Sequence, residues 1–460
     1  MNEKIYLQLE SIVGKDNVFR EIADRTRYSE DESHVKGIVP QAVLRPQNHQ
    51  QLIELIRLAN EYKFAVVPRG GGTGLAGGAV PIAPGIVISS ELLNSIIDID
   101  TGSMTAIVQA GVINSKLQAA ADELNMFYPV NPASMDSCTL GGNLAQSTGG
   151  ANTVRFGTTK NYITGIRAIT GEGLEWNAGG RIVKNSTDAT LINLMSGSEG
   201  ILSFFHELTF RLLPKPVYSA WIIALYKDII DIPRTVGLLF SRGHRPTMME
   251  LMDSKTLKLC SKHLKKEIRY SDLNQLLIRF DYDDKEYLEK TCFEFGEYCM
   301  ETGAEDVIIA DSAREKDVLW EIRSNIHEAI ENNAESFCEE DIVVPVNRIA
   351  ELIRKIQILT SNNNCQEILF GHLGDGNIHV NLIRNDDGKP EVEAVERIRN
   401  NLFEIGIALG GKPSGEHGIG LSKKKYFNSY VDPVYIEMLK KIKRQFDPNL
   451  ILNPGKIIDL

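Results

Sequence analysis

The feature that most constrains this chain is a cluster of glycines directly after a short apolar run. The run FAVVPRG predicts a buried strand, and the loop after it holds glycines at 70, 71, 72, 74, 77 and 78. Because glycine has no Cβ, such a loop lets several backbone N–H groups converge on an anion. The loop contains the pattern G-x-G-x-x-G, but a dinucleotide-binding fold needs a helix directly after it. Pro81 and Pro84, followed by the strand-like GIVISS, leave no room for that helix, so the sequence excludes a Rossmann fold.

Two more glycine-rich stretches follow in the same half of the chain. NPASMDSCTLGGNLAQSTGG carries paired glycines at 141–142 and 149–150, and SGSEG at 196–200 stands directly before a predicted strand. A flexible loop without a ligand is the simpler explanation of the first cluster, although Pro68 and Arg69 before it favour a shaped turn. Glycine-rich backbone surfaces of this kind suit a long ligand that carries a pyrophosphate and a flat ring.

The composition is that of a globular protein with more than one domain. The chain has 460 residues and a formal net charge of −11. That charge, without a long basic block, argues against binding to nucleic acid. No apolar run is long enough for a transmembrane helix and no signal peptide is recognisable. We therefore expect a cytoplasmic protein without a transmembrane segment, while peripheral attachment to a membrane stays open.

The six cysteines are scattered along the chain and form no C-x-x-C pair. This pattern is typical of reduced thiols in a protein core, and it argues against a disulfide framework, a zinc ribbon or an iron–sulfur cluster. Redox chemistry in this chain would therefore need a cofactor other than a cluster.

The order of predicted elements divides the chain into two α+β domains. Up to residue 215 short strands predominate, with an amphipathic helix in NHQQLIELIRLANEYK, and LLPKP marks a boundary. From 216 onwards strands alternate with long helices, which predicts an antiparallel sheet covered by helices. We expect domains at 1–215 and 216–425, and a C-terminal segment at 426–460 that contains the helix PVYIEMLKKIKRQF.

Three of the nine histidines lie in two short stretches, FGHLGDGNIHVNL and SGEHGIG. If Asp375 and Gly376 form a two-residue hairpin turn, His372 and His379 lie directly opposite each other on one face of the hairpin. Asn381, two residues further along, then points to the same face. Two imidazoles that converge in this way fit a divalent metal, whereas a packed hairpin with polar edges explains the same residues without one.

These motifs together resemble a known group of flavoproteins. The series PRGGGTGLAGG, NPASMDSCTLGGNLAQSTGG, FGTTKNYITGIRAIT and SGSEGILSFFHELTFRLLPKP resembles the FAD domain of vanillyl-alcohol-oxidase-type flavoproteins. GHLGDGNIHVN, SGEHGIG and FDPNLILNPGKI extend the resemblance to the branch of D-lactate, glycolate and D-2-hydroxyglutarate dehydrogenases, over about residues 35–460. The resemblance implies an α+β fold with a two-subdomain FAD-binding domain at 1–215 (core about 35–215), a substrate or cap domain at 216–425 with a helix-covered antiparallel sheet, and a C-terminal segment that returns to the FAD domain.

The resemblance also implies which residues hold FAD. The first glycine loop would hold the pyrophosphate, and the later motifs would line the remainder of the cofactor. The implied residues are Arg69, Gly70, Gly71, Gly72, Thr73, Gly74, Ser134, Gly141, Gly142, Thr148, Gly149, Gly150, Glu199 and Asn453. Relatives with covalent flavin often carry a histidine in the first loop, and no histidine lies between residues 68 and 81, so we expect noncovalent FAD.

The same resemblance gives roles to the histidine stretches. Metal-dependent members of this branch place ligands at the positions of His372, His379 and Glu416. The sequence does not choose between zinc, iron(II) and manganese. His417 is the implied general base, and Arg323 matches the arginine that binds the substrate carboxylate; an arginine on a helix surface paired with a glutamate is the alternative. The expected catalytic residues are His417, Arg323 and Asn381.

The implied reaction is oxidation of a small D-2-hydroxy acid, D-lactate first, by hydride transfer to flavin N5; glycolate and D-2-hydroxyglutarate are alternatives. Glu339 and Glu340 stand where dicarboxylate-using relatives place a basic residue, which favours a monocarboxylate. Without a cluster or a nicotinamide motif, the electrons need an external acceptor, such as an electron-transfer flavoprotein or a quinone or cytochrome system. An oxygen-using oxidase without a metal, and a flavin subunit of a larger assembly, are the other function classes.

Overall fold

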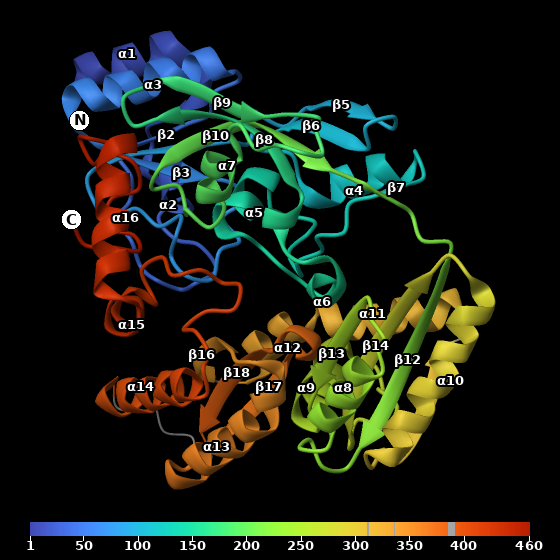
Figure 1. Ribbon diagram of the computed structural model, residues 1–460. Coiled ribbons are helices and arrows are strands. Elements are labelled where there is room, and N and C mark those ends of the chain that lie inside the picture. The colour runs from blue at the N-terminus through green and yellow to red at the C-terminus, as the bar shows by residue number, and fades with distance from the viewer. Residues whose placement is uncertain (311, 335, 385–391) are drawn as a thin grey trace. The chain divides into compact units, whose positions relative to one another are not determined.

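A computed structural model of the protein describes residues 1–310, 312–334, 336–384 and 392–460 (Figure 1). The contacts within the chain divide it into two compact units. The first unit contains Met1–Gly149, Thr158–Lys215 and Glu416–Leu460, and the second unit contains Gly150–Gly157 and Pro216–Gly415.

The second unit begins directly after residue 215, and the chain returns to the first unit at Glu416 rather than at the predicted 426. The backbone explains the earlier return, because the N–H group of Leu421 donates to the carbonyl of Ala76 at 2.7 Å. The segment that follows Gly415 is therefore already bonded to the first unit well before its next helix begins.

The short segment Gly150–Gly157 leaves the first unit and packs in the second. Arg279 Nη2 donates to Asn152 Oδ1 at 2.7 Å, and Arg155 Nη1 donates to Thr247 Oγ1 at 3.2 Å. Neither contact was predictable from sequence, since the partners lie about a hundred residues apart or more.

The first unit contains a mixed four-stranded sheet of order β1-β2-β4-β3, an antiparallel five-stranded sheet of order β5-β6-β10-β8-β9 and the short pair β11-β7. Its strands are β1 (Val18–Phe19), β2 (Ala42–Leu44), β3 (Ala65–Arg69), β4 (Gly85–Ser89), β5 (Ile96–Asp100), β6 (Thr105–Gln109), β7 (Met126–Phe127), β8 (Ile163–Thr170), β9 (Glu175–Gly179), β10 (Ser203–Arg211) and β11 (Leu213–Pro214). Its helices are α1 (Glu3–Val13), α2 (Ile22–Thr26), α3 (His49–Tyr62), α4 (Asn114–Asp122), α5 (Leu140–Gln146), α7 (Ala189–Met195), α15 (Lys424–Tyr430) and α16 (Pro433–Phe446), with 3-10 turns at Lys15–Asn17 and Thr159–Asn161.

The helix predicted in NHQQLIELIRLANEYK is α3. Asn48 begins it by accepting the N–H group of Gln51 at 3.0 Å, as an N-cap residue does. Leu52 and Ile56 on its buried stripe share a core with Leu9 of α1, and the two helices lie side by side (Figure 1). After this helix, β3 leads into the glycine loop, and β4 follows without an intervening helix.

The C-terminal segment adds to the four-stranded sheet of the first unit. Leu452 forms a parallel bridge with Val66 of β3, and the N–H group of Asn453 donates to the Val66 carbonyl at 2.7 Å. The segments at the two ends of the chain's colour range, blue and red, therefore meet in this unit (Figure 1).

The second unit is built on one antiparallel seven-stranded sheet of order β15-β12-β14-β13-β17-β18-β16. Its strands are β12 (Tyr218–Tyr226), β13 (Met248–Met252), β14 (Asn274–Tyr282), β15 (Asp306–Ala310), β16 (Ser336–Val343), β17 (Cys365–His372) and β18 (Asn377–Arg384). Its helices are α6 (Thr153–Phe156), α8 (Ile232–Ser241), α9 (Ser254–Leu264), α10 (Lys285–Glu301), α11 (Ala313–Ser324), α12 (Ile326–Asn333), α13 (Ile349–Asn362) and α14 (Val392–Ala408), with 3-10 turns at Val346–Arg348 and Leu373–Asp375.

Helices cover both faces of this sheet. One face shares a core with α9, α11 and α12, to which Ile368 of β17 and Ile322 of α11 both belong. Ring contacts between Phe280 and Phe295 place α10 on the opposite face, since Phe280 alternates with the neighbouring core-facing positions of β14. Strands buried on both faces explain why β13 reads MMELM, with one charged residue in an apolar run.

No helix in the described part of the chain is long and apolar enough to cross a membrane. The six cysteines are all free and buried. Burial raises the pKa of the Cys260 and Cys299 thiols to about 12, so they stay protonated and act as small apolar side chains.

A buried ion pair fixes the C-terminal segment, and its removal tests the fold. Lys443 Nζ bonds Asp447 and donates to the carbonyls of Ile201 at 2.7 Å and Leu452 at 2.8 Å. Because Lys443→Met leaves Asp447 buried without its cation, we expect the free energy of unfolding of the FAD-loaded protein to fall by about 3 kcal/mol. Denaturant titration measures the change.

The matched control is Lys441→Met, since Lys441 lies exposed on the same helix. We expect it to change the free energy of unfolding by less than about 0.5 kcal/mol. Equal effects of the two substitutions would contradict a stabilising role for the buried pair.

Candidate functional site

The first two glycine-rich stretches, the loop after β3 and the stretch around Thr139, pack closely against each other. A Cβ on Gly70 would lie 2.3 Å from Thr139 Oγ1, and a Cβ on Gly71 would lie 2.2 Å from the Ser137 carbonyl oxygen. Thr139 also caps α5 by accepting the N–H group of Gly142 at 3.2 Å. Only glycine fits at Gly70 and Gly71, so the first loop has a fixed shape.

Arg69 supports this loop from inside the fold. Its Nη1 donates to the Glu30 carbonyl at 2.8 Å, and its guanidinium lies over the Tyr28 ring at 5.4 Å. A Cβ on Gly72 would lie 2.1 Å from Arg69 Nη2, and Gly72 has φ 77°. Burial lowers the pKa of Arg69. A half-buried cation next to a glycine loop suits an anionic ligand such as a pyrophosphate.

The other residues expected to hold FAD fall into two groups by position. Thr73, Gly74, Ser134, Gly141, Gly142, Thr148, Gly149, Glu199 and Asn453 lie in the first unit with Arg69 and Gly70–Gly72. Gly150, with φ 131°, is grouped with the second unit, because it begins the segment that packs there.

Glu199 and Asn453 are buried, and the Asn453 side chain bonds the backbone of Glu199. Asn453 Nδ2 donates to the carbonyls of Glu199 at 2.7 Å and Gly78 at 2.9 Å. The Glu199 carboxylate accepts the N–H groups of Ile419 and Gly420, each at 2.7 Å. The side chain of Glu199 therefore holds the segment after His417, a role that the sequence did not indicate.

Several buried polar atoms of the first unit have no hydrogen-bond partner among the described residues. They are Gln146 Oε1, Ser198 Oγ, Ser422 Oγ and Asn453 Oδ1. Buried polar groups are normally paired, so unpaired ones on motifs expected to line a cofactor fit a polar ligand that completes their bonding. FAD, with its pyrophosphate, ribityl chain and ring carbonyls, supplies such partners.

The strand register around His372 and His379 differs from the predicted two-residue hairpin. Phe370, not His372, is paired with His379, and His372 is paired with Glu250 of β13. The prediction was wrong because a 3-10 turn at Leu373–Asp375 separates the strands and Gly371, with φ 144°, turns the end of β17 towards β13.

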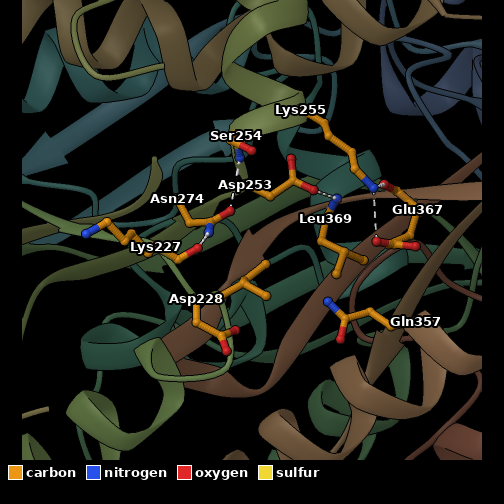
Figure 2. A pocket seen from close by; sticks show the side chains of 10 residues that line it. Lys227, Asp228, Asp253, Ser254, Lys255, Asn274, Gln357, Glu367 and Leu369 are labelled. Carbon is orange, nitrogen blue, oxygen red and sulfur yellow. Dashed lines mark hydrogen bonds and ion pairs between the residues drawn. The ribbon is translucent and has the colours of Figure 1, made fainter. Parts of the chain in front are cut away.

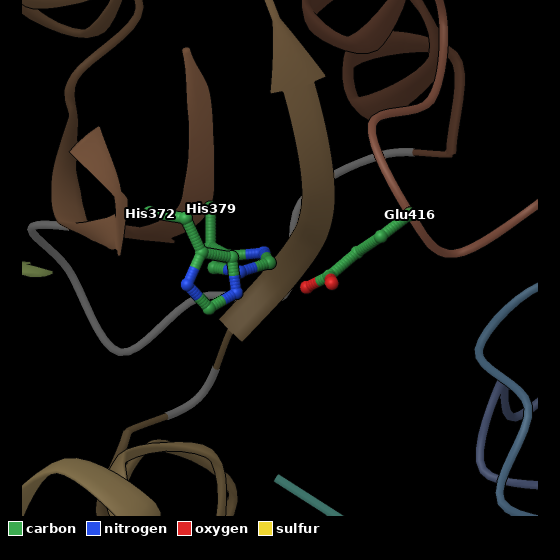
Figure 3. Close-up of side chains that lie close together, drawn as sticks. All are labelled: His372, His379 and Glu416. Carbon is green, nitrogen blue, oxygen red and sulfur yellow. The ribbon is translucent and has the colours of Figure 1, made fainter. Parts of the chain in front are cut away.

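The two imidazoles nevertheless converge. The rings of His372 and His379 lie 5.4 Å apart between centroids in an edge-to-face arrangement. One ligand atom each of His372, His379 and Glu416 lies within 4.8 Å of the others (Figure 3). Glu416 directly follows Gly415, the last residue of the second unit. Two histidines and a carboxylate at this spacing are a usual ligand set for a divalent ion.

Glu250 is a candidate site residue that the sequence prediction did not include. It is fully buried; its Oε1 accepts from His372 Nδ1 at 2.8 Å, and its Oε2 accepts from Arg323 Nε. Burial alone would raise the pKa of Glu250, but the Arg323 guanidinium and His372 outweigh it and hold the pKa below its usual value. The sequence did contain a signal for this residue, because Glu250 is the one acidic residue in the apolar run MMELM.

Arg323 and Asn381 lie in the same unit as these groups. Arg323 is buried, pairs with Glu250 and lies over the Phe370 ring at 5.6 Å, so it is not a surface arginine. Asn381 is paired with Ile368 and Glu339 across the sheet, and its Oδ1 accepts from Ser336 Oγ at 3.1 Å. Among the described residues Asn381 Nδ2 has no partner although it is buried.

The two glutamates considered for substrate choice point to opposite faces of β16. Glu339 is paired with Asn381, and its Oε1 bonds His327 Nδ1 at 3.2 Å. Glu340 alternates with it and bonds Arg399 of α14 on the other face. Only Glu339 shares a face of the sheet with Asn381, so Glu340 lies on the face opposite to the expected catalytic residue Asn381.

A separate hollow of about 390 Å³ lies elsewhere in the second unit (Figure 2). Lys255 bonds Glu367 at 3.0 Å across it, and Asp253 accepts the N–H group of Leu369 at 2.8 Å. The hollow is lined by none of the residues proposed for the site. Of its charged groups, Lys255 and Glu367 bond each other, and Lys227 bonds Glu305 outside the hollow.

The pKa of Glu199 gives a test of its buried position. Burial raises it to about 7, against the opposing effects of the Ile419 and Gly420 N–H groups. The native state therefore binds this proton more tightly than the unfolded state, and stability falls as the pH rises from about 4.5 towards about 7. We expect Glu199→Gln to lack this pH-dependent change in the free energy of unfolding, which amounts to about 3 kcal/mol in the wild type. Denaturation midpoints of both proteins across this range measure it; a difference that does not change with pH would contradict the assignment.

Comparisons with known proteins agree with this architecture. Residues 40–179 match a family described as FAD binding domain, and residues 215–457 match one described as FAD linked oxidases, C-terminal domain. The solved structure of p-cresol methylhydroxylase with substrate bound superposes with TM-score 0.80 at 17% identity, covering 99% of this chain and 96% of that one. A 4-ethylphenol oxidase from Gulosibacter chungangensis gives TM-score 0.78 at 15% identity, covering 99% and 98%. The fold is that of the vanillyl-alcohol-oxidase-type flavoproteins.

Curated relatives match almost the whole chain. A D-lactate dehydrogenase of Anaerostipes hadrus is 33% identical, covering 94% of this chain and 92% of the relative. The glycolate oxidase subunit GlcD of Bacillus subtilis is 32% identical (98% and 96% covered), and a D-2-hydroxyglutarate dehydrogenase of Stutzerimonas stutzeri is 30% identical (98% and 98%). The chain therefore belongs to the FAD-linked oxidase family, among the FAD-dependent oxidoreductases that include D-lactate, glycolate and D-2-hydroxyglutarate enzymes.

Proposed function

We propose that this protein oxidises a small D-2-hydroxy acid, D-lactate first, to the 2-oxo acid, with FAD as hydride acceptor and a divalent metal as Lewis acid. The observation that carries the proposal is the convergence of His372, His379 and Glu416 within 4.8 Å. An oxidase of alcohols that uses no metal has no need of such a donor set. The names of the relatives, which include lactate, glycolate and 2-hydroxyglutarate enzymes, support the same substrate class.

The donor chemistry fits a divalent ion. His372 bonds Glu250 through Nδ1, so its Nε2 is the atom directed away from that carboxylate and suited to a metal. A bound ion of this kind would lower the pKa of a substrate hydroxyl that coordinates it. Zinc, iron(II) and manganese all accept two histidines and one carboxylate.

FAD would lie on the glycine loops of the first unit. Gly70–Gly74 and Arg69 would hold the pyrophosphate. The unpaired side-chain oxygens of Gln146, Ser198 and Asn453 would form hydrogen bonds with the rest of the cofactor. When bound, FAD supplies the acceptor for the hydride that leaves the substrate Cα. The first loop has no histidine, so we propose that FAD is held without a covalent bond.

The chain's own residues bind the substrate and move its proton. Arg323 Nε donates to Glu250, which fixes the plane of the guanidinium and presents its terminal N–H groups to a substrate carboxylate. His417, next to the ligand Glu416, would accept the proton of the substrate hydroxyl. Asn381 Nδ2, buried on the same strand as His379, would donate to a substrate oxygen.

Glu339 supports a monocarboxylate substrate. It shares a face of the sheet with Asn381 and carries a negative charge next to His327. A second carboxylate on the substrate would approach that charge, which disfavours D-2-hydroxyglutarate relative to D-lactate. Glycolate, with a smaller side group, stays the closest alternative.

The electrons would pass to an external acceptor, because this chain offers only FAD as a redox centre in the proposed reaction. The six cysteines are buried and free, and they form no ligand group for a cluster in the described part of the chain. An electron-transfer flavoprotein or a quinone or cytochrome system would suit a reduced flavin. We propose that the protein lies in the cytoplasm and contacts a membrane only at the membrane surface, a location that suits either kind of acceptor.

The first prediction from this function concerns flavin reduction. Anaerobic mixing of the purified FAD-loaded protein with D-lactate should bleach the flavin absorbance, and glycolate should do so more slowly. Treatment with a chelator should abolish the bleaching, and added Mn²⁺ or Zn²⁺ should restore it. Fast bleaching by D-2-hydroxyglutarate but not D-lactate would contradict the role given to Glu339, and bleaching that survives complete metal removal would contradict the role of the metal.

A second prediction concerns Glu250. Glu250→Gln keeps the shape of the side chain but removes the charge that orients His372 and Arg323. We expect the Kd for Mn²⁺ to rise by about 10- to 100-fold, the usual effect of losing a carboxylate behind a histidine ligand. Mn²⁺ titration of the FAD-loaded protein in a competing chelator measures it.

Glu367→Gln is the matched control for this substitution. Glu367 lies on β17, the strand of His372, and bonds Lys255 and Thr360 instead of a metal ligand. We expect its Kd for Mn²⁺ to stay at the wild-type value. An unchanged Kd in both variants would show that Glu250 does not act on the metal.

A further inference from the structure

The segment Ser414–Gly420, SGEHGIG, carries both Glu416 and His417 but belongs to no helix or strand. Gly418 has φ 85° and Gly420 has φ 47°, so the backbone takes conformations that other residues rarely adopt. Without a ladder of hydrogen bonds, such a segment has a defined shape only if other groups bind its backbone.

A buried carboxylate binds the backbone on the N-terminal side of Glu416. Asp341 Oδ2 accepts the N–H group of Gly415 at 2.8 Å, and both of its oxygens accept from Ser414 Oγ, at 3.1 and 3.2 Å. A Cβ on Gly415 would lie 2.3 Å from Asn377 Nδ2, so this residue is closely enclosed. Asp341 is paired directly with His379 across the sheet. One residue therefore connects a histidine of the proposed metal site to the residue next to Glu416.

A second buried carboxylate binds the backbone on the C-terminal side of His417. Glu199 accepts the N–H group of Ile419 at Oε1 and that of Gly420 at Oε2, each at 2.7 Å. A Cβ on Gly420 would lie 2.0 Å from the Ala76 carbonyl oxygen. The carbonyl of Glu199 in turn accepts from Asn453. The side chain of Glu199 therefore binds two successive N–H groups, and the backbone of Glu199 is itself bonded to Asn453.

The hydrogen bonds at both places suit a carboxylate. Each carboxylate accepts hydrogen bonds from two neighbouring residues. Glu199 accepts one at each oxygen, and Asp341 Oδ2 accepts from both Gly415 and Ser414. An amide of the same shape offers one acceptor oxygen and places N–H groups against the remaining donor. Substitution by Asn or Gln therefore breaks the contact with little change of volume.

We propose that Asp341 and Glu199 are positioning residues that grip the segment on either side of Glu416 and His417, one from the second unit and one from the first. This inference rests on the proposed function for the roles of Glu416 and His417. Asp341 binds the residue directly before Glu416 and controls metal affinity. Glu199 binds the second and third residues after His417 and controls the rate of flavin reduction when metal and substrate are saturating.

The test compares Asp341→Asn and Glu199→Gln with two matched controls in FAD-loaded protein. Asp253→Asn removes a buried carboxylate of the second unit that accepts the N–H groups of Thr256 and Leu369. Asp447→Asn does the same in the first unit at Ile451 and Leu452. All four substitutions should lower the melting temperature, so stability alone cannot explain differences in metal binding or reaction rate.

We expect Asp341→Asn to raise the Kd for Mn²⁺ at least about tenfold. Glu199→Gln should instead lower the limiting rate of flavin reduction by D-lactate at least about tenfold, with a smaller change in the Kd for Mn²⁺. Both controls should keep wild-type values. Equal Kd and rate in Asp341→Asn, Glu199→Gln and the controls would overturn the proposal.

Amide hydrogen exchange in peptides that span residues 413–421 gives a readout independent of activity. Exchange should be faster in Asp341→Asn and Glu199→Gln than in wild type and unchanged in both controls. If the wild type oxidises no hydroxy acid, the proposed function fails, but faster exchange in the two variants still supports the positioning role of Asp341 and Glu199. Unchanged exchange in both variants would overturn that positioning role. Should Asp341→Asn fail to fold, Ser414→Ala removes one donor to the same carboxylate, and wild-type Mn²⁺ binding and exchange in that variant would count against the proposal.

Discussion

The buried carboxylate of Glu250 is the interaction on which the arrangement of the candidate site in the second unit depends. Taking a carboxylate out of water costs several kcal/mol unless opposite charge and hydrogen-bond donors surround it. Arg323 and His372 supply both, and they keep the pKa of Glu250 low in spite of its burial. Two side chains that would meet the substrate and the metal are therefore oriented by one acceptor, and neither can rotate without leaving a buried charge unpaired.

Much of the fold could be predicted from local sequence, because local patterns carry it. The strand β3 in FAVVPRG, the amphipathic helix α3 and the helix α16 in PVYIEMLKKIKRQF all occur where the sequence placed them. The glycine loop after β3 could be separated from a Rossmann fold because prolines left no room for a helix. The FAD-binding family followed from several such motifs in a fixed order, and the comparisons confirm it.

The parts that could not be predicted depend on contacts between distant strands. The predicted pairing of His372 with His379 was wrong. It assumed a two-residue turn at Asp375-Gly376, whereas the chain forms a 3-10 turn at Leu373–Asp375 and bends at Gly371. Glu250 was missed because its partners lie on other elements of the unit. The opposite directions of Glu339 and Glu340 follow from strand alternation, but only once β16 is known to be a strand with helices on both sides.

The separation of these partners along the chain has a consequence for how the protein reaches its native state. Glu250 and His372 are 122 residues apart in sequence, and Asp341 and Gly415 are 74 apart. Such non-local contacts form only after long loops have closed, which is slow. The complete ligand set therefore arises when the sheet of the second unit is nearly finished. Metal uptake would mark the last stage of folding, unlike small domains that need zinc to fold at all.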